Sequence, residues 1–210
     1  MPKRPPAGTR ARKKEDIRRR ILDAALALFQ KNGFEETTTR QIAIRARIAE
    51  GTLFNYFPTK DDIALFFLER EVDQAIAAVR GNKRLAKASL EEKLFALVEA
   101  QIDFLAPHER FIGAAFVSAL RPASMIARGV RADALRDRYL AFVDELVAES
   151  FPRGKRPALS WFAPHAFWIY YLGVLLYWLH DRSAGKENTL AFLDRSLKLG
   201  VSVLKRGTDA

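Results

Sequence analysis

Four residues in the segment 49–56 have the chemistry to read base edges of DNA: Glu50, Gly51, Thr52 and Asn55. A carboxylate can accept a hydrogen bond from cytosine N4, an asparagine amide can pair with adenine, and a threonine can touch a thymine methyl group or a phosphate. A glycine lets the backbone approach a base closely. One good pairing discriminates between bases by about 1–3 kcal/mol, which is enough to set a sequence preference.

Residues suited to catalysis or to metal binding are scarce. The chain has no cysteine and three histidines, which excludes disulfides, thiolate metal sites and cysteine nucleophiles and disfavours a histidine-rich metal site. No nucleophile–base pair, paired acids or phosphate loop stands out. We therefore expect no enzyme, no cofactor and no metal. The N-terminal charges are not followed by an apolar stretch, so a cytoplasmic protein without a secretory signal is expected.

Positive charge gathers at the N-terminal end of the chain. The net charge is +10, and residues 1–60 hold 14 lysines and arginines against 6 acidic residues. The remainder holds 21 against 19. A basic first third joined to a nearly neutral remainder indicates that one end meets a polyanion. Charge alone leaves two partners open, a nucleic acid and an anionic membrane surface.

Apolar residues recur at helical spacing along most of the chain, and no alternating strand pattern of useful length is present. Residues 1–13, with three prolines and five basic residues, are expected to form a disordered arm. A first helix is expected to stop at Gly33, and a second to start at the run Thr37–Thr39. Further helices are expected at about 49–56, 59–79, 89–105, 108–120, 125–150, 160–181 and 188–205.

Small and apolar residues at about 38–57 indicate a helix-turn-helix. Two helices that cross at a steep angle need little side-chain bulk at the crossing, which Ala43 and Ala46 provide, while Ile48 and Leu53 can fill the corner. A plain three-helix core is the alternative. We expect an all-α protein, with an N-terminal three-helix helix-turn-helix DNA-binding domain at 14–60 and a larger helical bundle at 61–210.

The first part of the chain also carries a family pattern at fixed spacings. Its residues are Arg18, Ile21-Leu22, Ala24-Ala25, Leu28-Phe29, Gly33, Thr37-Thr38, Ile42-Ala43, Ala46, Gly51 to Phe54, Tyr56-Phe57 and Lys60. This pattern resembles the N-terminal domain of TetR-family transcriptional regulators over roughly residues 14–65. The resemblance implies a dimeric repressor whose second bundle binds a small effector and dimerises.

The resemblance also implies phosphate contacts. Residues that resemble the family's backbone clamps are Thr38, Thr39, Arg40, Tyr56 and Lys60. Two positions depart from the pattern, since Arg47 stands where glycine is usual in the turn and Ala49 where serine or threonine is frequent. A residue other than glycine in left-handed geometry costs about 1–2 kcal/mol. Our hypothesis is that Arg47 offsets this cost by binding a backbone phosphate.

Two segments of the expected bundle could carry dimerisation. The last helix has apolar residues at steps of three and four that suit a shallow helix–helix contact: Leu190, Leu193, Leu197, Val201 and Leu204. Together the last two helices could form a four-helix interface between two copies. Packing of the seam within one copy is the alternative. The apolar segment 161–179 is also long enough for a marginal membrane span, which we consider the weaker interpretation.

A ligand cavity in the bundle is the least constrained expectation. Aromatic and other apolar residues that could line it are Phe104, Phe111, Phe116, Met125, Trp168 and Tyr171, although aromatics at helical spacing are more often plain core. The overall expectation is a ligand-responsive repressor that binds a palindromic operator as a homodimer and is released by a small apolar or aromatic effector. The alternative is a helical carrier of small molecules or lipids whose basic end docks to anionic surfaces.

Overall fold

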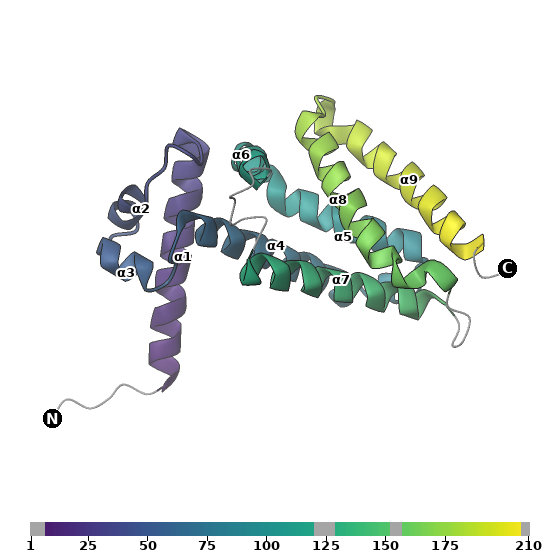
Figure 1. The fold of residues 1–210 in the computed structure, drawn as a ribbon, viewed down its shortest axis with the longest axis horizontal. Coiled ribbons are helices and arrows are strands. Elements are labelled where there is room, and N and C mark those ends of the chain that lie inside the picture. Colours follow the sequence, from purple (N-terminus) through teal and green to yellow (C-terminus); the bar gives the residue numbers. More distant parts are fainter. Residues whose placement is uncertain (1–6, 120–128, 152–156, 207–210) are drawn as a thin grey trace. The chain divides into compact units, whose positions relative to one another are not determined.

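The structure is a computed structural model that describes residues 7–119, 129–151 and 157–206, and the regular elements in these ranges are all helices (Figure 1). The α-helices are α1 (Ala7–Asn32), α2 (Thr39–Arg45), α3 (Glu50–Phe54), α4 (Lys60–Gly81), α5 (Leu90–Leu105), α6 (Glu109–Ala119), α7 (Val130–Ser150), α8 (Ala163–His180) and α9 (Glu187–Arg206). Short 3-10 turns lie at Leu85–Lys87, Ala106–His108, Ala158–Trp161 and Ala184–Lys186. The expected all-α class is confirmed.

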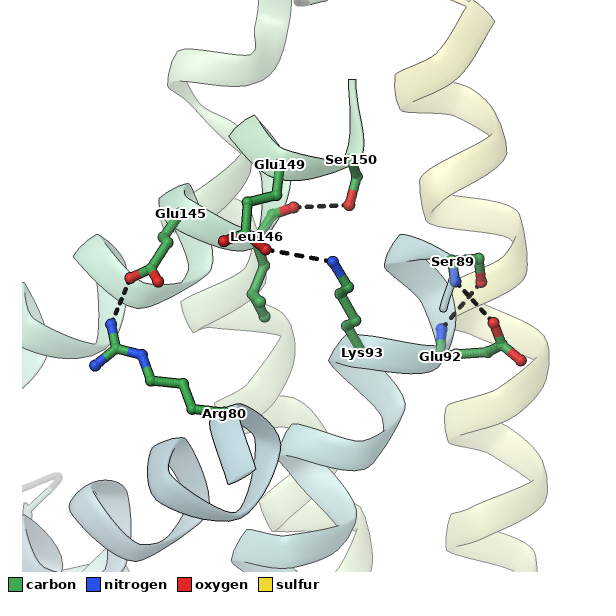
Figure 2. Close-up of polar contacts among 8 residues, drawn as sticks. All are labelled: Arg80, Ser89, Glu92, Lys93, Glu145, Leu146, Glu149 and Ser150. Atoms are coloured by element: carbon green, nitrogen blue, oxygen red, sulfur yellow. Dashed lines mark hydrogen bonds and ion pairs between the residues drawn. The ribbon is translucent and has the colours of Figure 1, made fainter. Parts of the chain in front are cut away.

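Several helix ends lie where their capping residues predict them. Gly33 has φ 92° and ends α1, and Ser89 and Glu92 form the capping box that starts α5 (Figure 2). The main difference is at the N-terminus, because α1 begins at Ala7 and residues 7–13 are therefore helical, not disordered as expected. The prolines lie before Ala7, whereas the alanines, arginines and lysine that follow favour a helix.

The chain divides into two compact units, and the division differs from the expected boundary at residue 60. The first unit is Met1–Leu68 with His108–Gly129, and the second unit is Glu69–Pro107 with Val130–Ala210. The boundary therefore falls inside α4, and α6 belongs with α1 to α3. In the first unit, Phe111 of α6 stacks on Phe29 at 4.9 Å between ring centroids and also contacts Phe34 and Phe67.

In the second unit, α5 packs against α7 and α9, and α8 packs against the same two helices. Ion pairs join α7 to its neighbours at its outer edge. Figure 2 shows Arg80 of α4 paired with Glu145, and Lys93 of α5 paired with Glu149 at 3.3 Å. No helix in the described ranges combines the length and apolar character needed to cross a membrane.

One buried carboxylate fixes the corner between α8 and α9. Asp181 accepts hydrogen bonds from the backbone N–H and the hydroxyl of both Ser183 and Thr189. Although burial opposes it, these hydrogen bonds hold the pKa of Asp181 well below its usual range. The corner orients α9 along α8.

The apolar seam of α9 faces its own unit. Leu193, Leu197 and Val201 are buried in the single chain, and Leu190 and Leu204 are half-buried. This corrects the expectation that the seam faces a second copy, because α5 and α8 already cover it. Helical spacing reveals that a helix has an apolar face but not which neighbour covers it.

A second buried carboxyl has no such network. Glu71 of α4 is 2% exposed, and its Oε1 atom has no hydrogen-bond partner. Burial raises its pKa to about 8, although the neighbouring Gln101 side chain acts in the opposite direction. Tyr139 and Tyr171 both lie within its electrostatic influence. At neutral pH Glu71 is therefore mostly protonated.

This environment predicts an unusual pH dependence of stability. A carboxyl whose pKa is raised on folding makes the fold less stable as the pH rises above 4.5, the pKa of the group in the unfolded chain. The loss of stability levels off above about pH 8, the pKa of the group in the folded chain. We expect Glu71→Gln, which cannot ionise, to raise the free energy of unfolding at pH 9 by on the order of several kcal/mol and to change it little at pH 5. Denaturant unfolding at both values measures this. Equal effects of the substitution at pH 5 and pH 9 would contradict it.

Candidate nucleic-acid interface

The second helix of the first unit is fixed at its N-terminus by reciprocal hydrogen bonds. The Thr38 hydroxyl accepts from the Gln41 N–H at 3.2 Å, and the Gln41 side chain accepts from the Thr38 N–H at 2.9 Å. This capping box satisfies two of the backbone donors that a helix start leaves open. Thr39 and Arg40 then follow in the first turn of α2, with Arg40 exposed.

The turn after α2 is closed by a left-handed residue, as the pattern predicts for this position. Arg47 has φ 55°, its N–H donates to the Ile44 carbonyl, and the Ile48 N–H donates to the Ala43 carbonyl at 3.0 Å. These two bonds form the Schellman arrangement, in which glycine is the usual left-handed residue. The departure from glycine therefore changes the residue but leaves the turn geometry intact.

Arg20 of α1 supports this turn by hydrogen bonds, a role that was not predicted from the sequence. Its guanidinium donates to the carbonyl of Ala46, which the end of α2 leaves open, and to the carbonyl of Arg47 in the turn. A cation at a helix C-terminus is also favoured by the helix dipole. The signal available in the sequence was an arginine directly before the buried Ile21.

The third helix is shorter than expected, because it runs from Glu50 to Phe54 and not through residues 49–56. Ala49 occupies its N-cap without a side-chain hydrogen bond, so the helix has little intrinsic support. Its position comes from Leu53, which is fully buried, and from Glu50, which accepts a hydrogen bond from the Thr39 hydroxyl at 3.0 Å. One Glu50 oxygen is thus used within the protein.

Two of the four expected base-reading residues, Gly51 and Asn55, stand four positions apart and so share one accessible side of α3 and its C-cap. Gly51 and Asn55 are exposed, and Glu50 and Thr52 are half-buried. A Cβ atom added to Gly51 would meet no other atom within 4 Å, so the protein itself does not require glycine there. An external surface that approaches the backbone closely would require it.

Positive charge lies beside this face. Arg20, Arg45 and Arg47 line a hollow of about 350 Å³ next to the turn, together with Asp23. Of the remaining candidates, Thr38 is exposed and Tyr56 is half-buried. Lys60 differs from expectation, because its ammonium group donates to the carbonyls of Phe34 and Glu35. Ile44 and Phe54 are exposed apolar residues that the sequence analysis did not single out.

The expected ligand residues do not come together in one place. Phe111 lies fully buried in the first unit, which corrects its assignment to a cavity of the bundle, because it packs against aromatic rings of α1 and α4. Phe116 is half-buried in the same unit. In the second unit, Trp168 and Tyr171 both contact Tyr139. Phe104 is half-buried in α5, and Met125 lies outside the described residues.

Part of the chain is similar to curated transcription regulators. An alignment with the HTH-type transcriptional repressor KstR of Rhodococcus jostii is 45% identical over 60 residues, 29% of this chain and 28% of the relative. The fatty acid metabolism regulator protein of Bacillus subtilis is 30% identical over 86 residues, 41% of this chain and 44% of the relative. The chain therefore spans less than half the length of these curated relatives.

Solved structures match nearly the whole fold. A TetR transcriptional regulator from Nitrosomonas europaea gives a TM-score of 0.70 at 20% identity and covers 87% of this chain and 96% of that protein. FadR from Bacillus subtilis, solved with stearoyl-CoA, gives a TM-score of 0.65 at 20% identity, with 86% and 95% covered. At this identity the likeness concerns the fold alone.

Two family models match separate parts of the chain. The model of bacterial regulatory proteins of the tetR family matches residues 21–65, which hold the helix-turn-helix. The model of the tetracyclin repressor-like C-terminal domain matches residues 93–208, more than half of the chain. The chain belongs to the TetR family of transcriptional regulators.

Proposed function

We propose that this regulator is a homodimeric repressor that binds a palindromic operator through α3 and leaves it when a small effector binds the second unit. The observation that carries the proposal is the accessible side of α3. It combines a glycine that the fold does not require with an exposed asparagine, and it follows directly on the capped helix α2 and its closed turn. Selection of duplexes from a random pool tests it, with inverted half-sites as the expected result.

Phosphate contacts would supply most of the affinity. Thr38, Arg40 and Arg47 are exposed around α3, and their hydroxyl and guanidinium groups suit phosphate oxygens. Lys60 is a weaker candidate, because its ammonium group already donates to two carbonyls. Tyr56 and Thr39 would contribute at the edges. Binding through such contacts weakens steeply as the salt concentration rises.

A dimer is supported by the outer faces of α8 and α9, which lie side by side (Figure 1). Large apolar residues are exposed on both helices: Ile169, Leu176, Tyr177, Phe192, Leu199 and Val203. The two stripes are continuous, because the ring of Phe192 contacts those of Tyr170 and Tyr177. Monomeric proteins rarely expose such a surface, and a second copy would cover it symmetrically.

The first prediction about operator binding concerns Gly51. Gly51→Ala should leave the fold intact and weaken operator binding by about tenfold or more, because a methyl group would separate the backbone from the bases. Gly81→Ala is the matched control, since Gly81 also lies in a helix with open space at its Cβ position. Fluorescence anisotropy with the selected duplex measures both. Equal operator affinity of the two variants would count against α3 as the reading helix.

The second prediction concerns the turn. Arg47→Gly should raise the free energy of unfolding by about 1 kcal/mol by relieving left-handed strain, yet reduce operator affinity. If Arg47 binds one phosphate, the slope of log K against log salt should become shallower by about 0.9. Arg182→Gln, which removes an exposed arginine from the second unit, should leave the slope unchanged. An unaltered slope in Arg47→Gly would exclude the phosphate contact.

The third prediction concerns the dimer. The double variant Ile169→Glu/Leu199→Glu should sediment as a monomer and lose most operator affinity, because one copy cannot hold two reading helices at half-sites about 34–36 Å apart. Val130→Glu places the same charge on a strongly exposed residue of α7 and should remain dimeric. Analytical ultracentrifugation separates the cases. A dimeric double variant would place the interface elsewhere.

A further inference from the structure

The second unit holds an apolar cavity that the DNA-binding face does not use. Its volume is about 310 Å³, and it lies among α5, α7, α8 and α9. Most of its wall is aliphatic, with Leu94, Val143, Val147 and Val201 as examples. No lysine, arginine, aspartate or glutamate is among the described residues that line it. Small-molecule pockets span about 300–1,000 Å³, so a volume at the lower end of this range suits a small apolar ligand.

A buried polar cluster is formed by residues of α4, α5, α7 and α8, and the last three of these helices also line the cavity. The Tyr139 hydroxyl donates to Oε1 of Gln101 at 2.9 Å, and Gln101 is fully buried. Its Nε2 atom and Oε1 of Glu71 both lack a hydrogen-bond partner. A buried donor or acceptor without a partner costs about 1–3 kcal/mol, so this cluster stays incomplete at the expense of stability.

One aromatic side chain belongs to both features. Phe167 of α8 lines the cavity, and its ring stacks on Tyr139 at 6.2 Å between centroids. Tyr139 in turn holds Gln101 beside Glu71. Phe167 therefore links the wall of the apolar cavity to the polar cluster.

The charges favour one kind of head group. The cluster contains a single ionisable acid, Glu71, and its titratable neighbours on α7 and α8 are Tyr139 and Tyr171, while α5 contributes the neutral Gln101. A carboxylate or phosphate head would lie against Glu71 with no cation to compensate it. An ammonium group would pair with Glu71 and lie near two tyrosine rings, which attract cations.

We propose that the second unit binds a hydrophobic amine once the Phe167 ring turns aside, with the ammonium group paired to Glu71 and the hydrocarbon tail in the cavity. This inference names the class of the effector. Its regulatory meaning rests on the proposed function, whereas binding of the amine does not depend on that function. Because Glu71 is mostly protonated at neutral pH, ion-pair formation transfers its carboxyl proton to solvent. Affinity should therefore rise between about pH 6 and pH 8, whereas Tyr139 and Tyr171 stay neutral there because burial raises the pKa of each well above 10.

Titration calorimetry of the full chain with octylamine, octanoic acid and 1-octanol tests the proposal. We expect octylamine to bind about tenfold more tightly than the other two and to release about one proton at pH 7, seen as a dependence of the heat on the buffer. Octanoic acid that binds as tightly as octylamine, or amine binding without proton release, would overturn it. These measurements need no variant.

Variants then locate the two ends of the ligand. Glu71→Gln should weaken octylamine by about tenfold and leave 1-octanol nearly unchanged. Asp103→Asn is the matched control, because it removes an exposed carboxylate two residues from Gln101 and should change neither. Gly200→Leu has space at its Cβ position beside the cavity and should weaken all three ligands. If Glu71→Gln kept full affinity for octylamine, the assignment of the ammonium group to Glu71 would be refuted. If Gly200→Leu kept it, the assignment of the tail to the cavity would be refuted.

Operator binding in the presence of octylamine separates this inference from the proposed function. Release of the operator by the amine supports both. Amine binding that leaves the operator bound upholds the site and refutes its role as the effector site. Failure to bind any operator, with amine binding retained, refutes the proposed function alone.

Discussion

The geometry of the helix-turn-helix depends on one tight turn. Helix α3 has five residues, no side-chain N-cap and a single fully buried leucine, so it cannot hold its own direction. Its direction is set by the left-handed residue Arg47 and by the two backbone hydrogen bonds across it. Arg20 adds charge-assisted hydrogen bonds to the carbonyls of Ala46 and Arg47, so α1 supports the corner as well as forming part of the core.

Helix α4 connects the two sites through contacts made separately in each unit. At its N-terminus, Lys60 holds the segment between α1 and α2 by its carbonyls. In the second unit, α4 is tied to α7 by three ion pairs, Glu69–Arg131, Asp73–Arg138 and Arg80–Glu145. Glu71 lies on the same helix and faces inward. A ligand that pairs with Glu71 therefore acts on the element that both units share.

The sequence predicted most of what local rules control. Helix starts at Thr38 and Ser89, the stop at Gly33 and the left-handed turn at Arg47 all follow from short-range hydrogen bonding and backbone sterics. The burial of Phe111 in the first unit and of the α9 seam within the second could not be predicted in this way, because both depend on which helices meet. Spacing identifies an apolar face, but the partner of that face is decided by contacts between residues far apart in the chain.

The same limit explains why Glu71 escaped notice in the sequence. A glutamate in a helix of mixed charge is most often exposed, and nothing within a few residues distinguishes this one from its neighbours Glu69 and Asp73, which form ion pairs. Only the assembled bundle shows that Glu71 faces Gln101 and two tyrosines with one oxygen unpaired. A leucine at this position would avoid both the desolvation and the unpaired oxygen. The loss of stability caused by a buried glutamate at this position has an explanation if a cation binds the cluster. The carboxyl that destabilises the empty bundle then stabilises the occupied one.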